Sequence, residues 1–180
     1  MERLSSKQVY VDPWLSVRRD EVRRSDGSSG VYSVVDTVDC SLVIPLEGDR
    51  VQLVEQDRYP VAGRLWEFPS GSANPLDADT SAAASRELRE ETGLATTTLH
   101  RLGVLDTMPS TLNQKCTVFL ATGLTQESPQ RDPEEQDMRS AWFTRSEVER
   151  LITSGGISDA KSIAAYALLL LREAMSRPGR

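Results

Sequence analysis

The sequence predicts an α+β fold, an α/β/α sandwich whose mixed central sheet is flanked by helices and preceded by a small N-terminal antiparallel sheet. Short runs of β-type residues separated by turn residues fill the beginning of the chain. An alanine-rich helical pattern ending at Gly93 interrupts the later strands, and two further helical patterns follow the last of them. Strands and helices in this order build a sheet that helices cover on its faces.

The N-terminal portion predicts three strands, at residues 8–11, 15–23 and 31–38, with a turn at residues 26–30. Two strongly apolar segments follow at residues 40–46 and 51–54, and the hairpin-like composition of residues 47–50 indicates that they pair in the central sheet. We therefore divide the chain into an N-terminal β subdomain, residues 1–38, and a main domain, residues 39–180.

The rest of the chain alternates further strands with helices. Residues 56–71 mix prolines, glycines, aromatics and charges, which predicts a structured loop with a short strand. Asp79 or Thr80 is the expected N-cap of the alanine-rich helix, and Gly93 lies just past its end. The remaining expected elements are strands at residues 99–105, 115–122 and 138–143, a helix at 145–152 started by a Thr144–Glu147 capping box, and a helix at 160–175 capped by Ser158 or Asp159.

Composition narrows the classes of function. The 180 residues carry a formal net charge of -6 and no basic run, so nucleic acid is not expected as the main partner. Divalent cations at clustered carboxylates would let so acidic a protein bind an anionic substrate. Cys40 and Cys116 lie in expected strands and are interpreted as reduced core residues. There is no signal-peptide pattern, and the longest apolar run, residues 163–171, is too short to span a bilayer, so we expect a cytoplasmic protein without membrane association.

Three glutamates near the end of the alanine-rich helix are the strongest chemical signal. Glu87, Glu90 and Glu91 are spaced so that their carboxylates lie on one side of a helix. They also occupy its last two turns, where the exposed carbonyl groups disfavour negative charge. The arrangement therefore costs stability and suggests a function. The alternative is a solvated charged face, with Arg86 and Arg89 forming surface pairs with these glutamates.

The segment around these glutamates resembles the Nudix hydrolase family. The family box reads G-x5-E-x7-R-E-U-x-E-E-x-G-U, where U is aliphatic, and Arg-Glu-Leu-Arg-Glu-Glu-Thr-Gly-Leu at residues 86–94 fills its second half. The first half departs, because Gly71 precedes Arg86 by one residue more than the pattern allows and no Glu lies between them. Either Gly71 and Asp77 align with a one-residue insertion, or the strict register uses Ser72 and Ala78.

We prefer the insertion because residues 67–71, Glu-Phe-Pro-Ser-Gly, resemble the segment that precedes the box in ADP-ribose pyrophosphatases. The wider resemblance favours the same branch of the family. Its segments are Gln-Asp-Arg-Tyr-Pro at residues 56–60, Trp-Glu-Phe-Pro-Ser-Gly at 66–71 and Gly-Ile-Ser-Asp-Ala-Lys-Ser at 156–162. The resemblance also implies a homodimer that pairs through the N-terminal strands, which would otherwise leave an exposed sheet edge.

The resemblance implies a magnesium-dependent mechanism, with Mn²⁺ as a substitute metal. Glu87 and Glu91 would be direct ligands, Glu90 a third carboxylate that serves both metal binding and catalysis, and the backbone carbonyl of Ser70 would complete the shell. Arg86 would orient Glu87 and Glu90 rather than touch the substrate. The general base would come from the acidic loop at residues 132–137, with Glu134 and Glu135 as the candidates.

Two residues before the box are the expected substrate contacts. Arg58 would bind the diphosphate because a guanidinium can hold two phosphate oxygens at once. Glu67 would accept hydrogen bonds from the base or ribose. For each, the alternative is a structural ion pair or a strand-edge charge.

The sequence thus predicts hydrolysis of the diphosphate bond of ADP-ribose or a related nucleotide sugar, giving a nucleoside monophosphate and a sugar phosphate. Two alternatives stay open. One is a Nudix hydrolase for another substrate, such as GDP-mannose or a UDP-sugar, with specificity set by the N-terminal sheet and the loop at residues 110–114. The other is a non-catalytic Nudix-like domain that binds nucleotide sugars and regulates a partner.

Overall fold

The computed structural model describes residues 1–74, 76–129 and 137–176. Its contacts divide the chain into a smaller unit, Met1–Asp39 with Asp106–Lys115, and a larger unit, Cys40–Leu105 with Cys116–Arg180. The sequence placed a boundary at residue 38 and did not anticipate that a segment from much later in the chain belongs to the smaller unit. That boundary stays a prediction.

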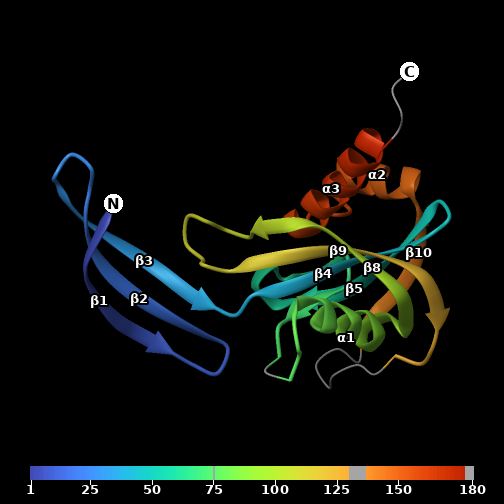
Figure 1. Ribbon diagram of the computed structural model, residues 1–180, viewed down its shortest axis with the longest axis horizontal. Helices are drawn as coiled ribbons and strands as arrows, with labels where there is room; N and C mark the ends of the chain where they lie inside the picture. The colour runs from blue at the N-terminus through green and yellow to red at the C-terminus, as the bar shows by residue number, and fades with distance from the viewer. Residues whose placement is uncertain (75, 130–136, 177–180) are drawn as a thin grey trace. The chain divides into compact units, whose positions relative to one another are not determined.

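The smaller unit is built on a three-stranded antiparallel sheet in the order β1-β2-β3 (Figure 1). Its strands are β1 (Glu2–Val11), β2 (Leu15–Arg23) and β3 (Ser29–Thr37). The carboxylate of Asp12 closes the first turn by accepting hydrogen bonds from the backbone N–H groups of Trp14 and Leu15, each at 2.8 Å. β1 begins at Glu2 rather than at Gln8, because its first residues are mainly polar and exposed and so carry no hydrophobic signal.

The segment Asp106–Lys115 is fastened to β3 by backbone and amide hydrogen bonds. The backbone N–H of Val35 donates to the carbonyl of Thr111 at 2.9 Å, and the N–H of Thr37 donates to the side-chain oxygen of Asn113 at 3.1 Å. The side-chain amide of Gln114 donates to the carbonyl of Val38 at 2.9 Å. The amides that the sequence assigned to a specificity loop are therefore engaged in holding the smaller unit together.

The larger unit contains a mixed sheet in the order β10-β5-β4-β9-β8, to which β6 adds beside β5 and β7 beside β4. These strands are β4 (Cys40–Glu47), β5 (Arg50–Arg58), β6 (Gly63–Glu67), β7 (Ser70–Ser72), β8 (Leu94–Asp106), β9 (Lys115–Gln126) and β10 (Arg139–Thr144). The predicted hairpin is present, with Leu46 opposite Val51. β4 and β9 run parallel, which makes the sheet mixed.

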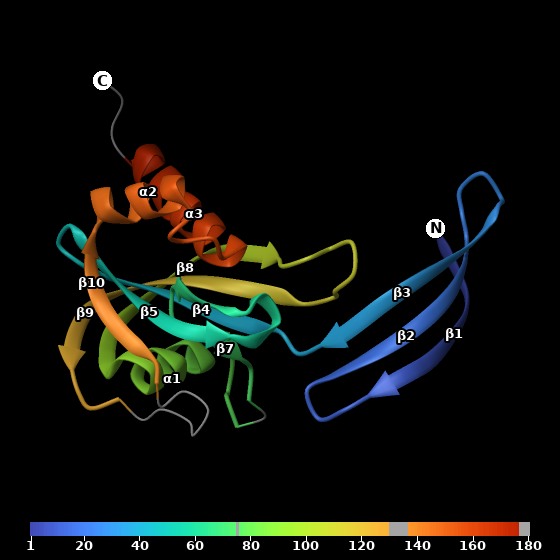
Figure 2. The same ribbon diagram turned by 180° about the vertical axis from the view of Figure 1, so that it is seen from behind.

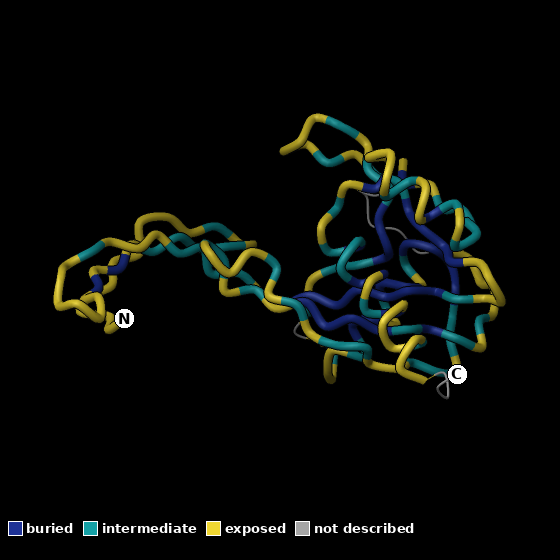
Figure 3. The backbone as a smooth tube through the Cα atoms, turned by 90° about the horizontal axis from the view of Figure 1, so that it is seen from above, coloured by how far each residue is buried: buried dark blue, intermediate teal, exposed yellow. Residues whose placement is uncertain are grey.

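Helices cover both faces of this sheet, so the predicted α/β/α arrangement is confirmed (Figures 1 and 2). α1 (Thr80–Thr92) lies on one face, and α2 (Arg145–Ser154) and α3 (Ala160–Ser176) lie on the other. Each face has its own apolar cluster, and the buried backbone is concentrated in the sheet of this unit (Figure 3). In the described residues, no helix has the length and apolar character needed to cross a membrane.

The helix ends follow the predicted capping chemistry. Asp79 caps α1 by accepting from the backbone N–H groups of Ser81 and Ala82, and Gly93 ends the helix with a left-handed φ of 72°. The Thr144–Glu147 capping box is formed at α2. Of the two candidates at α3, it is Asp159 that accepts from a backbone N–H of the first turn, at 2.8 Å.

The two cysteines are buried free thiols, as predicted. Cys40 and Cys116 are register partners on the parallel strands β4 and β9. The hydrogen bond with the Cys40 thiol, together with burial, raises the pKa of the Cys116 thiol far above its ordinary value. The Cys116 thiol is therefore protonated, and both side chains are packing groups of the core.

We expect Asp79→Ala to lower the free energy of unfolding by about 1 kcal/mol, because two backbone N–H groups of the first turn of α1 would lose their acceptor. Asp79→Asn is the matched control, since asparagine caps helices equally well. Urea denaturation of the three proteins measures the difference. An equal loss in both variants would show that the charge, and not the cap, stabilises the helix.

Candidate metal-binding and active site

The three glutamates of α1 are not a freely solvated face. Glu91 is 1% exposed and Glu87 is 7% exposed, whereas the side chain of Glu90 retains 24% of its exposure. A carboxylate that only confers solubility has no reason to be buried at the negative end of a helix. The burial therefore argues against the alternative in which these charges only meet water.

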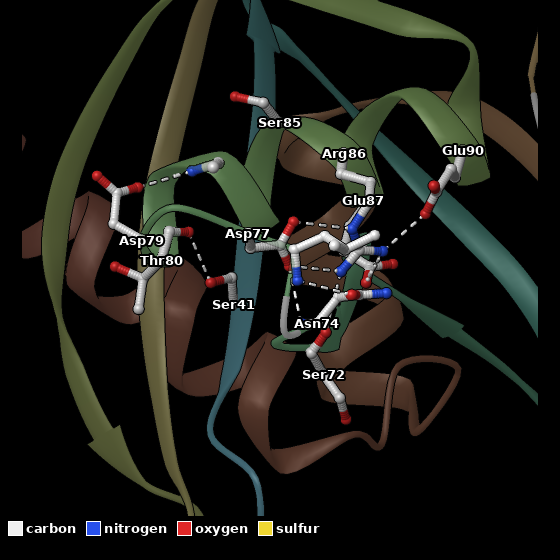
Figure 4. Close-up of polar contacts among 12 residues, drawn as sticks. Ser41, Ser72, Asn74, Asp77, Asp79, Thr80, Ser85, Arg86, Glu87 and Glu90 are labelled. Carbon is white, nitrogen blue, oxygen red and sulfur yellow. Dashed lines mark hydrogen bonds and ion pairs between the residues drawn. The ribbon is translucent and has the colours of Figure 1, made fainter.

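Arg86 is the cation that compensates this cluster (Figure 4). Its Nη1 donates to Glu87 at 2.7 Å and to Glu90 at 2.8 Å. Nε and Nη2 donate to the two carboxylate oxygens of Asp77 at 3.1 and 3.0 Å, and Nη2 also donates to the carbonyl of Ser72 at 3.0 Å. These bonds occupy all five N–H groups of the guanidinium. Arg86 thus orients carboxylates and has no donor left for a substrate.

Asp77 was not among the residues to which the sequence assigned a role. Both of its oxygens accept from Arg86, and Oδ2 also accepts from the backbone N–H of Asn74 at 2.8 Å. The Arg86 guanidinium first, and then the Asn74 backbone, hold the pKa of Asp77 below its ordinary value. These contacts favour the alignment that pairs Asp77 with the missing glutamate of the box. The extra residue then lies between Asp77 and Arg86.

Two of the glutamates contact the backbone of β7. The N–H of Ser70 donates to Oε2 of Glu91 at 3.2 Å. A Cβ added at Gly71 would overlap the carboxylate of Glu87, so only glycine allows this close approach. Ser70 is therefore beside Glu91, where the sequence expected it. That its carbonyl binds metal stays a prediction.

Arg58 and Glu67, the two expected substrate contacts, pair with each other. Nε and Nη2 of Arg58 donate to the two oxygens of Glu67 at 2.9 and 2.6 Å, and Glu67 is only 3% exposed. The hydrogen bond with Glu67 raises the pKa of Arg58, with smaller contributions from the charges of Glu91 and Asp159. The guanidinium therefore lies near Glu91 and the metal-ligand candidates.

The donor set suits a hard divalent cation. Arg86 pairs with three carboxylates, those of Asp77, Glu87 and Glu90, and Glu91 of the same helix adds a fourth. The charge of Arg58 is matched by Glu67. Oxygen ligands with excess negative charge are what Mg²⁺ and Mn²⁺ prefer. Within the described residues, no three such side chains already converge on one point. One oxygen each of Glu87 and Glu90 accepts from Arg86, and a carboxylate has further lone pairs that can bind a cation. The expected base candidates Glu134 and Glu135 lie outside the described residues.

Comparison with known proteins agrees with this geometry. The family model of the NUDIX domain matches residues 37–166. The ADP-ribose pyrophosphatase of Mycobacterium tuberculosis (strain ATCC 25618 / H37Rv) is 32% identical over 165 residues, which cover 91% of this chain and 80% of that protein. The chain belongs to the Nudix family. A second model, of the nucleoside diphosphate sugar hydrolase N-terminal domain, matches residues 1–35 of the Nudix chain.

Two further relatives span almost the whole Nudix chain. The ADP-ribose pyrophosphatase of Bacillus subtilis (strain 168) is 24% identical over 174 residues, covering 96% of this chain and 94% of that protein. A crystal structure of ADP compounds hydrolase has a TM-score of 0.83 at 23% identity, covering 96% of this chain and 92% of that chain, which shows the shared fold. The predicted family and fold are confirmed. The protein is a Nudix pyrophosphohydrolase.

We expect Asp77→Asn to weaken Mn²⁺ binding roughly 10- to 100-fold, as measured by electron paramagnetic resonance, because an amide holds Arg86 less firmly. Asp26→Asn, which removes a turn carboxylate in the smaller unit, should leave Mn²⁺ binding unchanged. The pKa of Asp77 is lowered in the folded protein, so its stabilisation is present above the ordinary value of 3.8 and is lost in more acidic solution. The stability gap between wild type and Asp77→Asn should therefore narrow below that pH. If Asp77→Asn binds Mn²⁺ as tightly as the wild type does, Asp77 does not support the metal site.

Proposed function

We propose that this protein hydrolyses the diphosphate bond of ADP-ribose or a closely related nucleotide sugar, giving a nucleoside monophosphate and a sugar phosphate. The observation that carries the proposal is the buried glutamate cluster of α1, held by an arginine whose donors are all engaged. The names of the related ADP-ribose pyrophosphatases support the substrate. The buried free thiols fit the reducing cytoplasm, which we propose as its location.

The metal we propose is Mg²⁺, with Mn²⁺ as a substitute. Glu87 and Glu91 would hold it directly, with Glu90 and the carbonyl oxygen of Ser70 completing the ligand set. When bound, a hard divalent ion neutralises phosphate charge and polarises the phosphorus–oxygen bonds. Arg86 keeps its carboxylates in place and lowers the repulsion among them.

The residues around the metal ligands would bind substrate and move the proton. Arg58 would donate to the diphosphate, because its guanidinium lies close enough to Glu91 for the two charges to interact. A carboxylate must accept the proton of the attacking water. We propose Glu134 or Glu135 for that step, both outside the described residues, with Glu90 as the partly exposed carboxylate that assists.

We also propose that two copies pair through the smaller unit. Every residue of β1 is exposed, and the strand presents Leu4, Val9, Tyr10 and Val11, each at least 44% exposed. A sheet edge with exposed apolar side chains is a surface that a second chain can cover.

Sedimentation equilibrium should therefore give twice the chain mass of 19.9 kDa. Val9→Lys on β1 should shift the protein toward the monomer, because it places a charge in the covered surface. Val61→Lys, at a similarly exposed valine outside the smaller unit, is the control and should remain dimeric. A monomeric wild type at all micromolar concentrations would rule out the proposed dimer.

The substrate is tested by incubating the purified protein with Mg²⁺ and ADP-ribose, GDP-mannose or UDP-glucose, and resolving the products by chromatography. We expect AMP and ribose 5-phosphate from ADP-ribose. Glu91→Gln should lower kcat more than about 100-fold, since it removes a metal ligand. Glu21→Gln, an exposed glutamate of the smaller unit, is the control and should keep full activity.

Each other outcome has a definite meaning. If GDP-mannose or UDP-glucose is cleaved selectively, the proposed diphosphate hydrolysis is correct and the proposed substrate is wrong. If nothing is cleaved with Mg²⁺ or Mn²⁺ while a nucleotide sugar raises Tm, the protein binds nucleotides without hydrolysing them. The proposed reaction would then be wrong.

A further inference from the structure

Glu67 is almost completely withdrawn from solvent, although it ends a strand next to the candidate site. It is 3% exposed, and both of its carboxylate oxygens accept hydrogen bonds from Arg58. A nucleotide would therefore meet a carboxylate that is almost inaccessible and whose two oxygens already accept charge-assisted hydrogen bonds. A direct contact between Glu67 and the base or ribose would disturb this buried pair.

The strand register shows that this pair dictates the direction of the arginine side chain. Arg58 lies opposite Gly63 at the far end of the β5–β6 hairpin, whereas Glu67 lies opposite Val54. Arg58 and Val54 are four residues apart and so share one face of β5. The arginine side chain must fold back along the hairpin to reach Glu67. Without that partner, a long and flexible side chain at a strand end would sample many rotamers.

Glu67 can direct Arg58 because the segment that carries it is rigid. The backbone N–H of the next residue, Phe68, donates to the hydroxyl of Ser162 at 2.9 Å, and Ser162 is 1% exposed. The backbone N–H of Ser70 donates to Glu91 at 3.2 Å. The same short segment therefore links Arg58, α3 and a candidate metal ligand, so their relative positions are fixed together.

We infer that Glu67 is a positioning residue that aims Arg58 at the diphosphate, and that it does not touch the nucleotide itself. The bidentate pair uses Nε and Nη2 and leaves Nη1 of Arg58 outside it. The two N–H groups of Nη1 can then meet an anionic phosphate oxygen without disturbing the pair. This inference rests on the proposed function, since it assigns the partner of Arg58 in that site.

A double-mutant cycle tests the inference, using Glu67→Gln, Arg58→Lys and the double variant. We measure kcat and KM for ADP-ribose and for IDP-ribose, which differs only in its base. Each single variant should lower kcat/KM roughly 10- to 100-fold, by the same factor for both substrates. The double variant should be no worse than Arg58→Lys, because Glu67 would act only through the arginine. Additive losses, or a loss that differs between the two bases, would show direct contact and overturn the inference.

Two controls separate positioning from damage to the site. Mn²⁺ affinity should change less than about twofold in Glu67→Gln, although Ser70 and Glu91 are close in the fold, because the inferred role is confined to Arg58. A parallel loss of Mn²⁺ affinity would mean that Glu67 supports the metal site instead. A single variant can fail to fold because it leaves a buried charge unmatched. In that case the neutral double variant Arg58→Met with Glu67→Gln, which has side chains of similar volume, takes the place of that variant in the comparison.

The same cycle is repeated for equilibrium binding of ADP by calorimetry, so that the inference does not depend on turnover. If wild type hydrolyses nothing but the cycle for ADP binding is fully coupled, the proposed reaction fails and the positioning role stands. If wild type hydrolyses ADP-ribose but the losses are additive, the reaction stands and the positioning role fails.

Discussion

The candidate site depends on the ion pairs between the guanidinium of Arg86 and the carboxylates around it. Glutamates buried at the carbonyl end of a helix repel one another and the helix dipole, which lowers the stability of α1. Arg86 offsets this loss from within the same helix by donating to Glu87 and Glu90. It also reaches Asp77 in the preceding loop and the carbonyl of Ser72 on β7. One side chain thus binds helix, loop and strand into a single frame.

The site uses two arginines for two tasks, holding the carboxylates and binding the phosphates. Because every N–H of Arg86 is engaged, it holds carboxylates and cannot also bind phosphate. The second arginine of the site, Arg58, has donors to spare after pairing with Glu67. Each guanidinium therefore has one role, which keeps the ligand cluster intact when an anionic substrate arrives. Backbone hydrogen bonds of the segment from Glu67 to Ser72 connect both arginines to the site: the Ser70 N–H donates to Glu91, and the Ser72 carbonyl accepts from Arg86.

The fold holds the segment around Glu67 and Ser70 in place from two sides. The segment between β6 and β7 is anchored from both faces of the sheet, by Ser162 of α3 on one side and by Glu91 of α1 on the other. Gly71 lets Glu87 approach the strand more closely than any side chain would permit. The layers that bury the apolar core are also the layers that position the polar groups.

The sequence by itself determined the local features of this protein. The helix of Thr80–Thr92, its caps at Asp79 and Gly93 and the shared side of its glutamates follow from spacing and capping chemistry between near neighbours. Only the tertiary structure decided that Asp77 binds Arg86, that Arg58 pairs with Glu67, and that a late segment joins the smaller unit. Those outcomes depend on strand register and on loops that bring distant residues together, and a residue pattern along one chain does not encode such distances.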